Sequence, residues 1–389
     1  MAEVVDRMEV LDEYRAILSG EARRVDVPAV ESELTQLWKA AAQDTLEGQP
    51  VVRACVLNLV GYAQGDDVAQ HINEVISRVS GRHPNRSIII VADPDAKSAG
   101  LRASISAHCQ IPPAGGRQVC SEQITLHASG AAVDEVHGTV LPLLVPGLPV
   151  FLWWHDEPPL DNHLFQELLD SCDHLVIDSA DFAPERAADL LADLQRITQE
   201  SDIALSDLNW ARLTHWRELV AQFFDASPGR QYLDRLDAVS VEIASVHGKQ
   251  PDLTEGLLLI GWLASRLGWV LEEGALRSRL DAMSFKLKSG AGPVTVKLTP
   301  DPHHPGEGLH SLSLQAAGGA VFAISRSADD PACGIVSAEL PEGSGYSRVV
   351  QMDLPSEATL LSDELDSPGH DAVFEETLAQ AVRLMDGGQ

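Results

Sequence analysis

The chain has 389 residues, more than one hydrophobic core usually supports, so we expect two domains. Its net charge is −30, from 58 acidic and 28 basic residues, and a surface this negative repels nucleic-acid phosphates and anionic lipid headgroups. Nucleic acid and membrane surfaces are therefore excluded as partners. The acidic first residues lack the cationic and apolar regions of a secretory signal, which predicts a cytoplasmic protein.

The first 200 residues predict a helical arm followed by an α/β domain. Residues 1–50 carry apolar side chains at three- and four-residue spacing, typical of an amphipathic helix that packs on the rest of the chain. Over residues 51–200, strand-like runs alternate with helical periodicity, which predicts a mixed sheet flanked by helices. The expected strands are 52–62, 87–92, 102–111, 119–128, 150–155 and 174–178, and the expected helices are 66–80, 131–144, 164–172 and 184–198.

Residues 201–389 form the second expected domain, with a boundary nearer residue 170 as the alternative. It begins with a long helix over 207–224, and its later strands are joined by short polar or glycine-containing loops. This pattern predicts an α+β domain with a mainly antiparallel sheet backed by helices. The expected strands are 238–245, 284–288, 294–299, 310–316, 321–326, 334–339 and 347–354, and the expected helices are 252–269 and 372–385.

Cysteine and histidine patterns predict neither a redox centre nor a metal site. The five cysteines contain no C-x-x-C pair, so we expect reduced, mostly buried thiols. The alternative is a redox or metal cluster of Cys55, Cys109 and Cys120, which lie in or beside strand-like runs and would meet if those strands are neighbours. Metal-ligand residue types gather once, among prolines and glycines that predict an exposed loop. They are Asp301, His303, His304, Glu307 and His310.

Catalytic motifs are absent from the sequence. It contains no G-x-G-x-x-G or G-x-x-x-x-G-K-[ST] loop, no H-E-x-x-H and no G-x-S-x-G, which disfavours nucleotide binding and hydrolase chemistry. We expect no catalytic residue and no cofactor. One alternative is a sugar-phosphate-binding enzyme or sensor, in which main-chain N–H groups of 113–117 and the side chain of Arg86 hold the phosphate.

Six of the seven tryptophans lie in three short runs, 150–155, 207–218 and 261–269. Tryptophan beside arginine is typical of protein interfaces, but strand and helix spacing places most of these rings in a core. We therefore expect the six rings to be core, and the polar residues beside them to be the better candidates for contact. The six are Trp153, Trp154, Trp210, Trp216, Trp262 and Trp269.

Several ordered runs resemble the glucose-6-phosphate dehydrogenase assembly protein family, OpcA. The runs are RACVLNLV at 53–60, RHPNRS at 82–87, CSEQIT at 120–125, LLVPGLPVFLWW at 143–154, IDS at 177–179, DLNWARLTHWR at 207–217 and GWLASRLGW at 261–269. The resemblance implies a non-catalytic activator that binds glucose-6-phosphate dehydrogenase and promotes its active oligomer in the oxidative pentose phosphate pathway.

Candidate contact residues for that partner are polar neighbours of the family motifs. We place Arg212 first, with Asn209 and His215 beside it, and then Glu122 and Gln123. Arg212 lies off the apolar stripe of its expected helix, so it should reach solvent. On this basis Arg212→Ala should weaken the complex and leave the melting temperature nearly unchanged.

Overall fold

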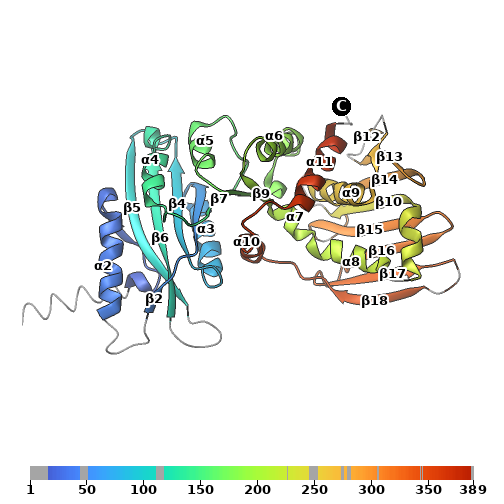
Figure 1. The fold of residues 1–389 in the computed structure, drawn as a ribbon, viewed down its shortest axis with the longest axis horizontal. Coiled ribbons are helices and arrows are strands. Elements are labelled where there is room, and N and C mark those ends of the chain that lie inside the picture. Colours follow the sequence, from blue (N-terminus) through green and yellow to red (C-terminus); the bar gives the residue numbers. More distant parts are fainter. Residues whose placement is uncertain are drawn as a thin grey trace, which may run out of the picture. The chain divides into compact units, whose positions relative to one another are not determined.

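The computed structural model describes residues 16–43, 51–110, 118–225, 227–244, 253–272, 276–277, 282–304, 306–341, 343 and 345–386. The chain divides into two compact units (Figure 1). Unit 1 comprises Met1–Ile177, Ile203–Leu205 and Glu357–Gly369, and unit 2 comprises Asp178–Asp202, Ser206–Ser356 and His370–Gln389. Each unit therefore draws on segments that lie far apart in the sequence. The domain limits expected at residues 50 and 200 stay a prediction.

A mixed sheet of nine strands, sheet A, forms the centre of unit 1, in the order β1-β5-β6-β4-β3-β7-β8-β9 with β2 beside β6. Its strands are β1 (Arg23–Val25), β2 (Val51–Arg53), β3 (Leu57–Gln64), β4 (Asn85–Asp93), β5 (Gly100–Gln110), β6 (Gln118–Ser129), β7 (Val150–Trp154), β8 (His174–Ile177) and β9 (Ala204–Asp207). Strands β6, β4, β3, β7 and β8 pair in parallel. If β1, β2 and β5 are left out, the remaining strands lie in the order β6-β4-β3-β7-β8-β9. Counted along the chain from β3, this is the 3-2-1-4-5-6 order of dinucleotide-binding folds.

Helices cover both faces of sheet A. On one face, α3 (Asp66–Val79) approaches so closely that a side chain at Gly61 would lie 3.1 Å from Ile72. The other face is covered by α2 (Val30–Gln43) and α5 (His163–Leu169). Trp38 of α2 donates a hydrogen bond to Glu122, and Phe165 of α5 contacts Trp154. Because both faces are covered, β3 and β4 are buried along nearly their whole length.

Unit 1 differs from the expected elements in three places. Strand β1 was not expected, and it pairs antiparallel with β5 where only a helical arm was predicted. The expected strand 52–62 is two strands, β2 and β3, which lie on different neighbours. The expected helix 131–144 is a series of short turns around α4 (His137–Val140), because Pro142 ends the regular hydrogen bonding.

The expected hairpin of β5 and β6 is confirmed, and its register places Cys109 opposite Cys120. These two residues form a disulfide, so the expectation of reduced thiols is wrong for this pair. Cys55, Cys172 and Cys333 are free thiols. Cys55 lies beside the pair in the fold, since the N–H of Ala54 donates to the carbonyl of Cys120.

Unit 2 is built on a second sheet of nine strands, sheet B, in which β10 and β14 are parallel and the other pairings are antiparallel. The strands are β10 (Leu236–Ala244), β11 (Val270–Leu271), β12 (Leu276–Arg277), β13 (Met283–Ser289), β14 (Gly292–Asp301), β15 (Gly308–Ala316), β16 (Ala320–Arg326), β17 (Cys333–Glu339) and β18 (Tyr346–Gln351). The α/β and α+β classes expected from the sequence are confirmed.

The helices of unit 2 pack on one face of sheet B and on one another (Figure 1). They are α6 (Ala187–Glu200), α7 (Leu208–Arg212), α8 (Thr214–Phe224), α9 (Leu253–Leu267) and α11 (Ala372–Asp386). The long helix expected over 207–224 is interrupted at Leu213, which separates α7 from α8. Helix α9 is apolar nearly all round because it lies between the sheet and α11: a side chain at Gly256 would meet Leu298, and one at Gly261 would meet Thr377.

None of the helices in the described ranges combines the length and the apolar character that a membrane crossing requires. The longest of them, α9 and α11, have 15 residues each.

Candidate functional site

One face of sheet B is left uncovered by the helices that the structure describes. Alternate residues of β10 and β13–β17 point towards α8 and α9 and are buried, whereas those between them are half-buried or exposed. The strand register arranges the outward residues in rows. The central row is Ser284, Lys297, Ser240, Ser313, Ala323, Ser337 and Ser347. Most of these side chains are short, so another protein surface can approach the sheet closely.

Two further rows flank the central one. The first is Thr299, Glu242, Ser311, Ser325, Ile335 and Val349, and the second is Lys286, Thr295, Ala238, Gln315, Val321 and Glu339. We call these three rows the open face. Ile335 and Val349 lie opposite each other and are 46% and 73% exposed, which gives one end of the face an apolar pair. The other end carries Lys286 and Lys297.

The predicted contact residue Arg212 lies at the end of α7, where its guanidinium binds both carboxylate oxygens of Asp178. The two side chains are 31% and 9% exposed, so Arg212 is half-buried in an ion pair. This corrects the expectation of a free surface arginine. His215 reaches solvent at 43% exposure, and its Nε2 lies 2.9 Å from the carbonyl oxygen of Gln351.

Asn209 is 1% exposed and belongs to a buried network that joins the IDS and DLNW motifs. The carboxylate of Asp207 accepts from the main-chain N–H groups of Ser179 and Asn209, and its other oxygen lies 2.6 Å from the hydroxyl of Ser179. The amide of Asn209 donates to the same hydroxyl at 3.1 Å. Asn209 thus stabilises the fold and offers no surface to a partner, which corrects its placement as a contact residue.

Complete burial raises the pKa of Asp207 to about 7, and the nearby charge of Asp178 adds to the increase. Near neutral pH this carboxyl therefore changes charge within the unit. A perturbed buried acid is typical of active sites but also of structural ion-pair networks. The partners of Asp207 are all groups of the protein interior, so the network is structural.

Glu122 and Gln123 are also interior residues, at 1% and 4% exposure, which corrects their assignment to a contact surface. Glu122 forms ion pairs with Arg86 at 2.8 Å and Arg53 at 2.7 Å, and its Oε1 also accepts a hydrogen bond from the indole of Trp38. Adjacent residues of a strand point to opposite faces, so Gln123 instead donates to Asn73 of α3 at 2.7 Å.

Arg86, named in the sugar-phosphate alternative, is 3% exposed and lies inside this ion cluster. Besides Glu122 it binds Glu31 and donates to the carbonyl of Leu143 at 2.8 Å. Its charge is therefore matched within the protein. The other part of that alternative, residues 113–117, lies outside the described residues.

Five of the six motif tryptophans are buried, at 4% exposure or less, and Trp262 is half-buried. The buried ones are Trp153, Trp154, Trp210, Trp216 and Trp269. Trp154 stacks on Tyr62 at 3.9 Å and contacts Phe165 edge-on, on the α5 side of sheet A. Trp153, one residue earlier, faces the α3 side.

The point where dinucleotide-binding folds hold their ligand lies in sheet A between β3 and β7, at the carboxyl ends of the strands. In this chain the turn after β3 has Gly65 but no glycine fingerprint, and α3 begins with Asp66 and Asp67. Two carboxylates at that helix start repel a pyrophosphate, which such folds bind there. The strand order is thus present without the groups that bind the phosphates.

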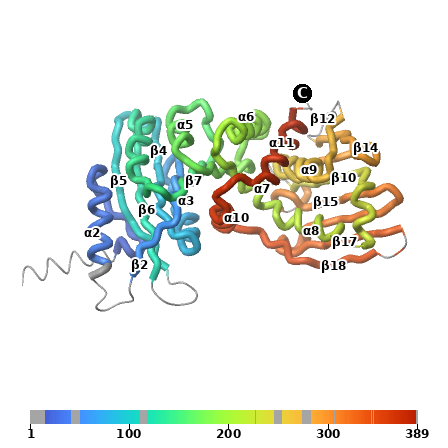
Figure 2. The backbone as a smooth tube through the Cα atoms, in the orientation of Figure 1, coloured from blue at the N-terminus to red at the C-terminus, as the bar shows by residue number. Residues whose placement is uncertain are grey.

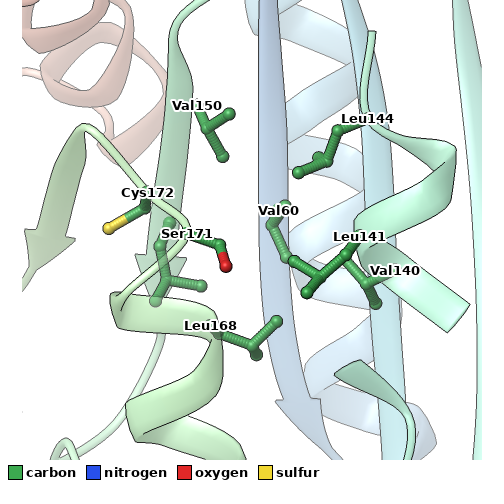
Figure 3. Close-up of a pocket in the computed structure, with 9 residues that line it drawn as sticks. Val60, Val140, Leu141, Leu144, Val150, Leu168, Ser171 and Cys172 are labelled. Carbon is green, nitrogen blue, oxygen red and sulfur yellow. The ribbon is translucent and has the colours of Figure 1, made fainter. Parts of the chain in front are cut away.

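A small cavity lies on the α5 side of β3 and β7, lined almost entirely by apolar side chains (Figure 3). The lining residues are Val60, Val140, Leu141, Leu144, Val150, Leu152, Leu168, Ser171 and Cys172. Its volume of about 10 Å³ holds at most one water molecule. Burial raises the pKa of the Cys172 thiol to about 12, so this cysteine is unreactive at neutral pH.

The histidine-rich stretch near residue 301 is less exposed than expected. His310 is 7% exposed, stacks on His304 at 4.1 Å and lies 3.3 Å from Asp301. Among the described residues, one group of three brings potential metal ligands close together. It consists of His71, His155 and Glu357, whose ligand atoms all lie within 4.8 Å of one another. Sequence patterns gave no signal for it, because its members are separated by 84 and 202 positions.

Comparison with known proteins identifies relatives that match both halves of the chain. Two family models match, described as the N-terminal and the C-terminal domain of a glucose-6-phosphate dehydrogenase subunit, over residues 76–197 and 203–378. Proteins that carry the name OxPP cycle protein OpcA are also similar to this chain. The relative from Nostoc punctiforme is 29% identical over 331 residues, covering 80% of this chain and 67% of that protein. The one from Synechococcus elongatus is 33% identical over 298 residues, covering 72% of this chain and 63% of that protein.

Solved structures give weaker similarities. A 3-ketoreductase from Actinomadura kijaniata superposes with a TM-score of 0.48 at 13% identity, covering 85% of this chain and 96% of that chain. A levoglucosan dehydrogenase gives a TM-score of 0.49 at 9% identity, covering 85% and 98%. Similarities of this size say nothing about activity. The two family models together span most of the sequence, and the chain belongs to the OpcA family of glucose-6-phosphate dehydrogenase assembly proteins.

Proposed function

We propose that this chain is a non-catalytic protein that binds glucose-6-phosphate dehydrogenase and acts as its assembly factor and allosteric activator in the oxidative pentose phosphate pathway. Family membership supports the choice of partner. The observation that carries the proposal is the open face of sheet B, a broad surface of short side chains in unit 2. We assign it as the docking surface for the dehydrogenase.

The size of the open face suits a specific complex. It crosses seven strands, β13-β14-β10-β15-β16-β17-β18, and is three rows deep. With strands about 4.8 Å apart and rows about 6.8 Å apart, it covers roughly 700 Å². A standard interface buries about 800 Å² on each partner. The open face together with its rim therefore accounts for a stable interface.

Charge favours an unlike partner over a second copy of this chain. Two copies that each carry a net charge of −30 repel each other. Against that background, Lys286 and Lys297 place two positive charges at one end of the open face. An acidic patch on the dehydrogenase would complement this end, and the apolar pair of Ile335 and Val349 would be buried at the other.

Of the contact residues predicted from the sequence, His215 and the exposed part of Arg212 can still touch a partner directly. Asn209, Glu122 and Gln123 would influence binding only by holding their units in shape. We keep Arg212 and His215 as secondary contact candidates, outside the open face.

Co-elution and kinetics test the proposed function. The purified chain should co-elute with its cognate dehydrogenase on size exclusion, and should raise that enzyme's rate or lower its substrate half-saturation concentration. Co-elution without any kinetic change would mean a purely structural role. If neither effect occurs at micromolar concentrations, the proposed function is wrong.

A charge reversal tests the proposed polarity of the interface. Lys297→Glu should slow association and weaken the complex by roughly 3- to 10-fold at low salt, because a charge at the edge of an interface acts mainly on the association rate. The difference from the unmodified chain should shrink as salt is added. Tighter binding of Lys297→Glu would contradict an acidic partner surface.

The second candidate function is a sugar-phosphate-binding enzyme or sensor, and the 3-2-1-4-5-6 strand order of sheet A favours it. Asp66 and Asp67 at the start of α3 argue against it, since two carboxylates repel a phosphate at the helix N-terminus where such folds bind one. Thermal unfolding in the absence of the dehydrogenase separates the two functions. A rise in melting temperature with glucose 6-phosphate or NADP would support the second candidate, whereas a partner-binding protein should show no shift.

A further inference from the structure

His71, His155 and Glu357 meet at the carboxyl end of the parallel strands of sheet A. His155 directly follows β7, and His71 lies on α3, the helix that follows the adjacent strand β3. Glu357 is the first residue of α10 (Glu357–Leu365), which returns to unit 1 from late in the chain. Figure 2 shows α10, in dark red, beside α3. All three residues belong to unit 1.

The geometry of the three side chains suits a metal ion. Nε2 of His71 lies 2.5 Å from Oε2 of Glu357, and the rings of His71 and His155 are 5.4 Å apart and nearly perpendicular. The donor atoms of all three lie within 4.8 Å of one another. In a tetrahedral site with metal–ligand distances of about 2.0–2.2 Å, donors are roughly 3.4 Å apart. Small rotations of these partly exposed side chains reach that arrangement.

Two further features of the same place favour a ligand. The carboxyl ends of β3 and β7 flank the point where strand order reverses, which is where open α/β sheets bind their ligands. Asp156, next to His155, has φ 108°, a conformation that costs a non-glycine residue about 1–3 kcal/mol and clusters at functional sites. It fixes the direction in which the chain leaves His155.

We propose that His71, His155 and Glu357 bind a divalent transition-metal ion of the Zn²⁺ class, and that the ion fastens α10 to α3 and the end of β7. Two imidazoles and one carboxylate are a ligand set that Zn²⁺ uses with an open fourth position. His71 is 47% exposed, so an ion can enter from solvent. Without a metal, the ion pair of His71 with Glu357 joins α3 to the start of α10.

Titration of the tag-free full chain with Zn²⁺ tests the proposal, with Co²⁺ as a spectroscopic probe of the same site. We expect one tight site per chain. His71→Ala and Glu357→Gln should each weaken binding by at least about 100-fold, because loss of a mere outer-shell group already costs 10- to 100-fold. His71 is exposed on its helix, so its replacement leaves the fold intact. The test therefore stays valid even if replacing the third ligand, as in His155→Ala, unfolds the chain.

The matched control is a second histidine pair in unit 1. His137 and His163 are also 5.4 Å apart and flank Glu167, but this set does not form a group of close donor atoms. His163→Ala should bind Zn²⁺ as the unmodified chain does. Equal binding by all variants, or loss in His163→Ala alone, would overturn the assignment.

Hydrogen exchange tests the structural consequence separately. Addition of Zn²⁺ should slow amide exchange in the first turns of α10 and should have no such effect in Glu357→Gln. This outcome does not depend on the dehydrogenase, so it is independent of the proposed function. Binding of Zn²⁺ without any change in α10 would overturn the fastening role.

Discussion

Sheet A and sheet B have nine strands each, yet they differ in how many of their faces are covered. The parallel strands of sheet A lie between α3 on one face and α2 and α5 on the other, and β4 is buried over eight of its nine residues. In sheet B, the antiparallel strands alternate between buried and accessible residues, as in β17. In unit 1 the sheet is therefore part of a core on both faces, whereas in unit 2 the helices that the structure describes leave one face of the sheet accessible.

Polar residues follow the same division. In sheet A, a charged residue such as Glu122 is buried and matched by arginines. On the open face, Glu242 and Lys297 are exposed. A substitution in sheet A should therefore act on stability, and one on the open face should act on binding.

The largest effect is expected for Glu122→Ala. It leaves Arg86 buried without its carboxylate, and breaking a buried ion pair from one side costs about 3–5 kcal/mol. The matched control in sheet B is Glu242→Ala, which should change the free energy of unfolding by less than about 0.5 kcal/mol. Urea unfolding of both variants measures the contrast, and similar losses would remove the distinction between the two sheets.

Asp207 gives the next largest effect, as a dependence of stability on pH. Its folded-state pKa of about 7 lies above the 3.8 of an unperturbed aspartate, so the folded state retains a proton that the unfolded state loses. This contribution is complete below about pH 4 and is lost as pH rises through 7, at up to about 1.4 kcal/mol per pH unit.

Asp207→Asn should remove that slope. Between pH 5 and 8 the free energy of unfolding of the unmodified chain should fall relative to that of the variant, and urea titrations at each pH measure the difference. A difference that stays constant across this range would show that Asp207 is ionised throughout.

Arg212→Ala is expected to cost about 1–3 kcal/mol. It leaves the carboxylate of Asp178 without its cation, and the 31% exposure of Arg212 places the cost below that of a fully buried pair. This replaces the expectation of an unchanged melting temperature. If thermal unfolding is unaffected while the complex is lost, Arg212 belongs to the interface after all.

Much of the fold could be predicted from the sequence because its strands and helices follow clear periods. Period-two alternation marked β13–β17 as strands with one buried face, and this is the signal from which the open face could have been inferred. The break at Leu213 was hidden, because the apolar spacing of the helix continues through it. Strands β1 and β9 are three and four residues long, too short to show a period.

The site residues were harder to place, for a different reason. Spacing tells which residues share an element but not which elements meet. Glu122 finds Arg86, Arg53 and Trp38 from three other segments, so its burial could not be deduced from its own strand. The same holds for Asp178, which pairs with Arg212 across 34 positions.

Two matched substitutions test whether the open face of sheet B binds the dehydrogenase. Ser313→Arg puts a long charged side chain at the centre of that face, on a half-buried position of β15, and Ser98→Arg makes the same change at an exposed position of unit 1. Both should alter the free energy of unfolding by less than about 0.5 kcal/mol. We predict that Ser313→Arg no longer co-elutes with or activates glucose-6-phosphate dehydrogenase, while Ser98→Arg does both. Full activation by a folded Ser313→Arg protein would contradict the claim.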